Sequence, residues 1–258
     1  MLSKNQVKFI HSLRLKKFRE ENNLFAAEGT KIVMDIINSP IKVRQIFSTK
    51  DFIGKIFSEN QKDNEGLKKV DIIEVSENEL KKISNLTSPN EVLAIAEIPK
   101  HELSIDILPS RLTLALDQIC DPGNLGTIIR IADWFGIENI ICSQDTVDTF
   151  NSKVIQSTMG SITRVRVHYK DLELILKGLQ NKISIYGALL EGENIYKKKL
   201  KETGLILIGN ESRGISKKLL PYLTDKITIP QTSFSKEAGM SLNAAIAAGI
   251  ICSEFRRN

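Results

Sequence analysis

The stretch LTLALDQICDPGNLGTIIRIADWFG, residues 112–136, decides how the chain folds. Its first eight residues are mostly apolar and have the length of a buried strand. A turn at Asp121, Pro122 and Gly123 separates them from an apolar segment with helical spacing. Because a buried strand followed at once by a helix is the repeating unit of parallel sheets, this stretch predicts an α/β domain around itself.

The alternation of strand and helix continues to the C-terminus. Strands are expected at 112–119, 137–142, 162–167, 183–190, 204–209 and 226–229, with helical patterns between most of them. Apolar strands of this kind predict a mostly parallel sheet covered by helices on both faces. Ligands of such sheets bind at the carboxyl ends of the strands, so we expect a site at the loops after Ile119, Gly209 and Ile229.

A smaller α/β unit precedes this domain. Helices are expected at 3–17, 30–37, 51–57 and 77–83, and strands at 24–28, 43–48, 72–75 and 92–97. The polar stretch between Pro99 and Pro109 is typical of a linker. We therefore divide the chain into residues 1–98, a linker at 99–110 and a C-terminal domain at 111–258.

The composition excludes several classes of protein. The chain has 258 residues, of which 41% are hydrophobic and 26% charged, as in ordinary globular proteins. Its longest apolar run, 244–252, is roughly half of what a bilayer crossing needs, so we expect a cytoplasmic protein without membrane contact. Three widely spaced cysteines, Cys120, Cys142 and Cys252, are expected to be buried thiols, and without CxxC or HExxH spacing no metal is predicted.

Positive charge gathers at the N-terminus. The net charge is only +5, but the first 19 residues contain no acid and six basic residues: Lys4, Lys8, Arg14, Lys16, Lys17 and Arg19. Such a run is either the solvated face of a helix or a surface that contacts phosphates. The run alone leaves both interpretations open.

The first of three unusual loops is DPGNLGTIIRIADWFG, residues 121–136. A turn, a cap at Asn124 and an apolar helix face explain all of it except Arg130. A cation within two turns of a helix N-terminus opposes the helix dipole. A helix start at a sheet edge is also where an anionic or ribose-bearing ligand would approach, so Arg130 is a candidate functional residue.

The second loop, GNESRGIS from Gly209, follows an apolar strand. It lacks the lysine of a phosphate loop, because Ile215 and Ser216 occupy the required positions, and the chain has no GxGxxG. What the loop presents is Glu211 and Arg213, and a solvated ion pair between them is the simplest interpretation.

The third loop opens the segment IPQTSFSKEAGMSLNAAIAAGIICSEF, residues 229–255. A strand ends at its start, and after a polar loop a helix begins at Ser241 or a neighbour. The alanines and glycine of that helix allow another backbone to approach closely, either its own sheet or a second subunit. Ser241 is then simply a helix cap.

In this order the loops resemble the three motifs of the SpoU (TrmH) branch of SPOUT RNA methyltransferases. Motif 1 is similar to DPGNLGTIIRIA, motif 2 to LIGNESRGIS, and motif 3 to IP followed by SLNAAIAA. The first hundred residues, with KFREENNLFAAEGTKIVMDII and SPNEVLAIAE, resemble the L30e-like substrate-binding domain that often precedes such a domain. The resemblance implies methyl transfer from S-adenosylmethionine to a ribose 2′-hydroxyl. It also implies an α/β SPOUT domain with a deep trefoil knot and a homodimer, formed through the C-terminal domain, whose protomers build each site together.

The resemblance also implies which residues form the site. The catalytic residues are Asn124, Arg130, Glu211, Ser241 and Asn243, with Arg130 acting on the ribose hydroxyl. The residues around S-adenosylmethionine are Leu189, Gly209, Asn210, Gly214, Ile229 and Leu242. The chain departs from the family in motif 3, where QTSFSKEAGM lengthens the loop and Met240 precedes Ser241. Glu237 and Gly239 are then available for the displaced roles.

The chemistry limits what Arg130 does. A ribose hydroxyl is a very weak acid, and a permanently protonated guanidinium stabilises the developing alkoxide rather than accepting its proton. The proton acceptor stays open, and the reaction needs no metal.

The resemblance favours the interpretation of the six N-terminal basic residues as an RNA-binding surface, which Arg164, Arg166, Lys197–Lys199 and Lys201 would extend. We expect structured RNA as the substrate and favour ribosomal over transfer RNA. The alternative is a non-catalytic RNA-binding or ribosome-assembly factor that retains the fold, against which the five intact motif residues argue. A nucleotide-dependent enzyme of another class lacks its phosphate-binding fingerprints.

Overall fold

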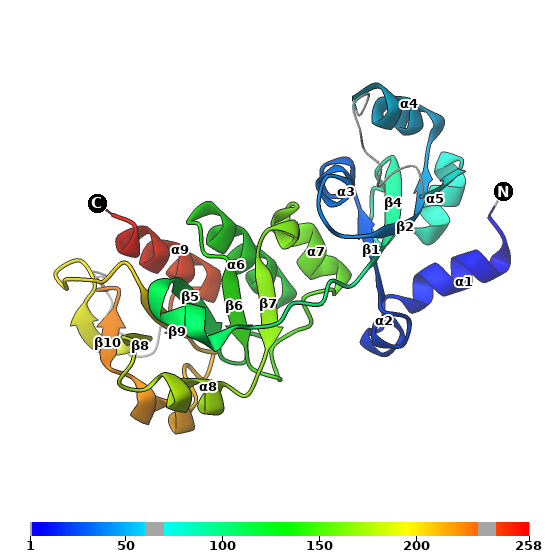
Figure 1. The fold of residues 1–258 in the computed structure, drawn as a ribbon. Coiled ribbons are helices and arrows are strands. Elements are labelled where there is room, and N and C mark those ends of the chain that lie inside the picture. Colours follow the sequence, from blue (N-terminus) through cyan, green and yellow to red (C-terminus); the bar gives the residue numbers. More distant parts are fainter. Residues whose placement is uncertain (1, 60–69, 232–240, 258) are drawn as a thin grey trace. The chain divides into compact units, whose positions relative to one another are not determined.

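The computed structural model describes residues 2–59, 70–231 and 241–257, which form two compact units (Figure 1). The first unit comprises residues 1–100 and 150–163, and the second comprises residues 101–149 and 164–258. The first unit ends close to the boundary expected at residue 98. It also includes 150–163, which the sequence assigned to the C-terminal domain: α7 (Ser152–Thr158) contacts the first strand, and the rings of Phe25 and Phe150 lie 4.9 Å apart.

The first unit is a mixed four-stranded sheet between helices. Its strands are β1 (Leu24–Glu28), β2 (Val43–Ser48), β3 (Asp71–Glu74) and β4 (Val92–Glu97), in the order β1-β4-β2-β3. Side chains alternate between the two faces, so Phe47 and Leu93 pack beneath α1 (Lys4–Ser12) and α5 (Glu77–Ile83). Their neighbours Ile46 and Ala94 pack beneath α3 (Thr30–Ile37) and α4 (Lys50–Glu59).

The single helix expected at 3–17 is wrong, because two helices replace it. A capping box between Ser3 and Gln6 starts α1, which ends at Ser12. The second helix, α2 (Lys16–Asn22), begins after Leu15, whose backbone is extended. Leu13 between them is buried in the core of the unit, so the chain turns there rather than continuing as one exposed helix.

The second unit is built on a parallel six-stranded sheet, as the sequence predicts. The strands are β5 (Leu112–Leu116), β6 (Asn139–Cys142), β7 (Arg166–Tyr169), β8 (Ile185–Asn194), β9 (Gly204–Ile208) and β10 (Asp225–Thr228), in the order β10-β8-β9-β5-β6-β7. Every pair of neighbouring strands is parallel. The strand expected at 162–167 is wrong in its first half, because Ser161–Thr163 form a 3₁₀ turn and β7 starts at Arg166.

Helices cover both faces of this sheet (Figure 1). On one face α8 (Leu172–Leu179) packs with the 3₁₀ helices Ile105–Ser110 and Lys217–Tyr222. On the other face α6 (Pro122–Trp134) and α9 (Ala244–Phe255) pack against each other. Leu108, which falls in the expected linker, is fully buried in the first of these layers, so the linker is anchored to the domain core at that residue. None of the described helices is long and apolar enough to cross a bilayer.

Two leucines of α8 provide a test of this packing. Leu176 is 0% exposed, whereas Leu174 on the same helix is 68% exposed. We expect Leu176→Ala to lower the free energy of unfolding by about 2–5 kcal/mol, because it leaves a cavity under the sheet. Leu174→Ala is expected to change it by less than about 0.5 kcal/mol. Urea unfolding followed by far-ultraviolet circular dichroism measures both, and equal losses would contradict the assigned layer.

Candidate active site

Hydrogen bonds join two loops at the carboxyl edge of the parallel sheet. Since β5 and β9 are parallel neighbours, the segments that follow them emerge side by side. The backbone N–H of Ser216 donates to Asp117 Oδ2 at 2.7 Å, and the side-chain amide of Asn210 donates to the carbonyl of Gln118 at 2.7 Å. Asp117 was not expected in the site. The signal that could have identified it is an acid placed directly after a buried strand.

The first motif forms the start of α6, but its cap differs from the expectation. The side chain of Asp121, rather than that of Asn124, caps the helix by accepting from the backbone N–H of Asn124 at 2.8 Å. Pro122 occupies the first helical position, where its missing N–H costs nothing. The prediction of Asn124 as the cap is therefore wrong, and its carboxamide is available for contacts with other loops.

The carboxamide of Asn124 joins the three motifs. Its Nδ2 donates to Glu211 Oε1 at 2.8 Å, and its Oδ1 accepts from Asn243 Nδ2 at 2.8 Å. An ionised carboxylate only accepts hydrogen bonds, so Glu211 fixes which end of the Asn124 amide faces it. Glu211 does not form the expected ion pair with Arg213 among the described contacts.

The third motif enters this network through the start of α9. Asn243 is the cap of the helix, because its Oδ1 accepts from the backbone N–H groups of Ala245 and Ile246 at 2.9 and 3.2 Å. Ser241, the other possible cap, instead donates from its hydroxyl to the backbone carbonyl of Glu211 at 3.3 Å. Four of the five expected catalytic residues are thus brought together. Glu237 and Gly239 lie outside the described residues.

Arg130 is the exception. It follows Asn124 by six residues on α6, which places the two side chains about 120° apart around the helix axis. Arg130 is exposed, and within residues 2–59, 70–231 and 241–257 it makes no hydrogen bond or ion pair. It shares its helix face with Trp134, which is four residues further on and 84% exposed. Among the described residues of one copy, Arg130 is therefore not joined to the hydrogen-bond network of the other four.

The residues expected around the cofactor include a tight turn after β9. Asn210 and Gly214 exchange two backbone hydrogen bonds of 3.0 Å. A Cβ on Gly209 would lie 2.2 Å from the carbonyl carbon of Gly214, so only glycine fits there. The apolar members are placed differently from one another: Leu189 is half-buried in the middle of β8, Ile229 is half-buried directly after β10, and Leu242 is 49% exposed.

The three thiols differ in their surroundings. Cys142 and Cys252 are buried as expected, and burial raises the pKa of both, that of Cys252 to about 12. The expectation is wrong for Cys120, which is exposed in the loop after β5 and lies 3.7 Å from Asn210 Nδ2. In the described part of the chain no group of His, Cys, Asp and Glu could hold a metal ion.

Of the six expected RNA-binding residues, five are exposed: Lys4, Lys8, Arg14, Lys16 and Lys17. Arg19 is 2% exposed, and its guanidinium donates to the carbonyls of Leu13 and Arg14, each at 2.8 Å. These carbonyls lie in the turn between α1 and α2, so Arg19 stabilises that turn and is left out of the proposed RNA surface. Arg164 and Lys198, in the expected extension, form ion pairs with Asp133 and with Glu193 and Asp225.

Fold and site together define an α/β protein whose amide, carboxylate and hydroxyl groups converge at the carboxyl edge of a parallel sheet. The chain belongs to the SpoU rRNA methylase family, whose model matches residues 111–253. Residues 4–94 match the MRM3-like substrate binding domain. These matches confirm the family and the fold class predicted from the sequence.

Relatives match along the whole chain. The 23S rRNA (guanosine(2553)-2′-O)-methyltransferase RlmP of Bacillus subtilis is 28% identical over 98% of this chain and 97% of its own length. A TrmH-family protein from Porphyromonas gingivalis has a structure with a TM-score of 0.86 and 35% identity, covering 99% of this chain and 98% of its own. The AdoMet-bound rRNA methyltransferase of Sinorhizobium meliloti gives a TM-score of 0.85 and 29% identity, covering 99% and 95%.

The difference in exposure among the thiols is directly testable. We expect iodoacetamide at pH 8 to modify Cys120 alone in the folded protein, because burial both shields Cys142 and Cys252 and keeps them protonated. Intact-mass and peptide mass spectrometry would detect one added group, and three after unfolding in guanidinium. Rapid modification of a second cysteine in the folded protein would contradict the assigned burial.

Proposed function

We propose that this protein transfers a methyl group from S-adenosylmethionine to the 2′-hydroxyl of a ribose in ribosomal RNA. The observation that carries the proposal is the hydrogen-bond network of Asn124 with Glu211 and Asn243, which joins the three motif loops at one edge of the sheet. The names of RlmP and of the 30% identical 23S rRNA (uridine(2479)-2′-O)-methyltransferase of Streptomyces viridochromogenes support ribosomal over transfer RNA as the substrate.

The residues at this edge suit S-adenosylmethionine, which brings a methyl group on a positively charged sulfur that is a good leaving group. Leu189 in β8, Ile229 directly after β10 and Leu242 before α9 offer apolar contacts, as the flat faces of an adenine require. The turn from Gly209 to Gly214 has no room for a side chain at its start, so it presents backbone groups, which suit the polar edge of a nucleoside. These residues would hold the cofactor and leave the hydroxyl to the catalytic residues.

Activation of the hydroxyl falls to Arg130. Its guanidinium stays protonated, so it stabilises negative charge as the O2′ proton leaves. Glu211 and Asn124 hold each other and the loop that carries Glu211, while Ser241 fastens the backbone of the same loop. The chain thereby contributes positioning and charge stabilisation to a displacement that the donor already favours.

In the proposed homodimer, Arg130 of one copy acts at the Asn124–Glu211 network of the other copy. The α6 and α9 helices pack together, and each exposes an apolar side chain: Trp134 is 84% and Ile246 56% exposed. A second copy that covers this face would bury the apolar side chains and bring its own Arg130 to the Asn124–Glu211 network. The homodimer through the C-terminal domain, and the deep trefoil knot typical of the family, are both part of the proposal.

The exposed cations of α1 and α2 form the proposed phosphate-binding surface. Lys4 and Lys8 lie on one helix and Lys16 and Lys17 on the next, where the latter two contact Glu20 and Glu21 at 3.7 and 3.8 Å. Contacts of lysine with RNA phosphates release counterions, so binding should weaken steeply as salt rises. Because ribosomal RNA is the proposed substrate, we place the enzyme in the cytoplasm.

Methyl transfer is tested directly with labelled S-adenosylmethionine and total RNA from a strain that lacks the gene. We expect label in ribosomal RNA, at a nucleotide whose 3′ linkage resists alkaline cleavage once its 2′-hydroxyl is methylated. If the protein binds S-adenosylmethionine and RNA but transfers no label to RNA from any source, the enzymatic proposal fails and the non-catalytic assembly factor takes its place.

Removal of the guanidinium separates catalysis from binding. We expect Arg130→Ala to lower kcat about 100- to 1000-fold, as loss of one charge-stabilising donor does elsewhere. Calorimetry should show an unchanged affinity for S-adenosylmethionine, and thermal unfolding an unchanged Tm, because Arg130 is exposed and makes no described contact. Lys177→Ala, which removes an exposed cation from α8, is the matched control and should keep full activity. A kcat within threefold of the wild type would exclude Arg130 from the reaction.

A further inference from the structure

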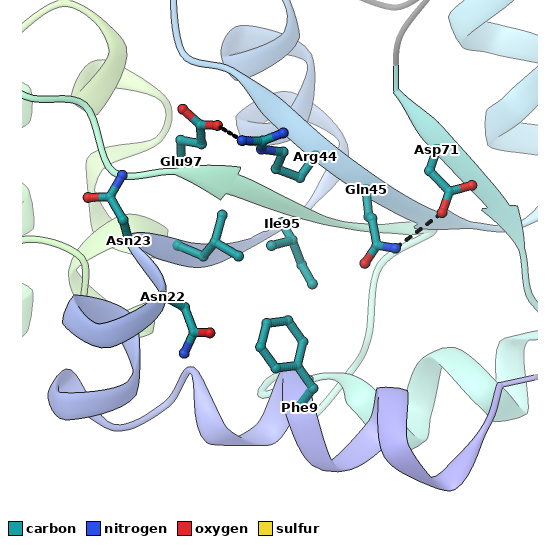
Figure 2. Close-up of a pocket in the computed structure, with 9 residues that line it drawn as sticks. Phe9, Asn22, Asn23, Arg44, Gln45, Asp71, Ile95 and Glu97 are labelled. Atoms are coloured by element: carbon teal, nitrogen blue, oxygen red, sulfur yellow. Dashed lines mark hydrogen bonds and ion pairs between the residues drawn. The ribbon is translucent and has the colours of Figure 1, made fainter.

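The first unit contains a cavity of about 550 Å³ between α1 and the sheet, as Figure 2 shows. Its floor is apolar and comes from Leu24 on β1 and Ile95 on β4. The ring of Phe9 projects from α1 toward Ile95 and forms the opposite wall (Figure 2). A cavity of this volume lies within the range of small-molecule sites, and nothing in the proposed methyl transfer uses it.

Polar side chains also line the cavity. Asn22 and Asn23, at the end of α2, lie at one side of the cavity, and Gln45 and Asp71 lie at the other (Figure 2). Asn22 donates one side-chain N–H to the carbonyl of Phe18 at 2.7 Å, and Gln45 donates one to Asp71 Oδ2 at 3.1 Å. Each of these two amides keeps a second N–H and a carbonyl oxygen with no described partner, so each can still donate and accept.

The charges at the cavity argue against a phosphate. The lining contains two carboxylates, Asp71 and Glu97, and one cation, Arg44, which already forms an ion pair with Glu97. An anion would therefore be repelled. The lining side chains suit an uncharged, flat ligand that has apolar faces and a hydrogen-bonding edge.

We propose that this cavity binds an unpaired nucleobase of the RNA substrate, with the base stacked on Phe9 and its edge hydrogen-bonded to Asn22 and Gln45. The proposal rests on the proposed function, which makes RNA the substrate. It agrees with the charge of the segment, because the exposed Lys4 and Lys8 lie on the same helix as Phe9. Bases splayed out of loops and bulges are recognised in proteins by this combination of an aromatic face and polar side chains.

The break between α1 and α2 creates one side of the cavity. With the chain turned at 13–15, α2 ends at Asn22, and Asn23 is held in a left-handed conformation (φ 53°) directly before β1. Arg19 bonds the two carbonyls of the turn, so it acts as a positioning residue for the two asparagines. In this proposal, Arg19 is buried in an otherwise exposed basic run because it holds the two asparagines at the cavity.

The test measures binding of the full-length protein to two kinds of RNA hairpin by fluorescence anisotropy. One hairpin carries a single bulged nucleotide, made in turn with each of the four bases, and the other carries an abasic residue at the same place. We expect at least one bulged base to bind about 5- to 100-fold more tightly than the abasic hairpin, as base–aromatic stacking predicts. In Phe9→Leu that ratio should fall close to one, and in Gln45→Ala it should fall in part, while the affinity for the abasic hairpin stays unchanged.

Phe18→Leu is the matched control, since it removes a half-buried ring from α2 outside the cavity and should keep the wild-type ratio. A wild type that binds all hairpins with equal affinity overturns the nucleobase site but leaves the proposed RNA methylation standing. A Phe9→Leu variant that keeps the wild-type ratio also overturns the nucleobase site and leaves the proposed RNA methylation standing. A wild type that binds no RNA overturns both. The readout is binding rather than methyl transfer, so the two failures are distinguishable.

Discussion

The candidate active site depends on one side chain, the carboxamide of Asn124. It donates to Glu211 after β9 and accepts from Asn243 at the start of α9, so it holds together loops that lie 87 and 119 residues further along the sequence. Asn124 can do this because Asp121 takes over the capping of α6. The same Asn243 caps α9, so the network fixes the start of a core helix and the position of the site at once.

Much of the second unit could be predicted from its sequence, because apolar strands that alternate with helices permit few other folds. The carboxyl edge of the sheet followed from the same pattern. The contacts within the loops did not: whether Asp121 or Asn124 caps α6, and whether Ser241 or Asn243 caps α9, depends on three-dimensional neighbours that a local pattern does not contain. The position of Arg130 away from the other four residues was equally invisible, because motif order carries no information about the direction of a side chain.

In the first unit the strands could be predicted from the sequence, but the cavity beside Phe9 could not. The basic run looked like one continuous helix, but burial of Leu13 turns the chain, and Arg19 enters the fold to satisfy the carbonyls of the turn. The other basic residues of the run are exposed to solvent, and Phe9, which belongs to the same run, lines the cavity. The cations proposed to bind the RNA backbone and one wall of the cavity proposed to bind a base thus come from the same short segment.

The central claim is that the Asn124–Glu211 network of one copy works with Arg130 of another. It is tested most directly by a heterodimer of Arg130→Ala and Glu211→Ala protomers, carrying two different tags and purified through both. The account predicts two inactive homodimers and a heterodimer with about half of the wild-type kcat, because one of its two sites contains both residues intact. A heterodimer as inactive as the homodimers would contradict it, since both residues would then act within a single copy.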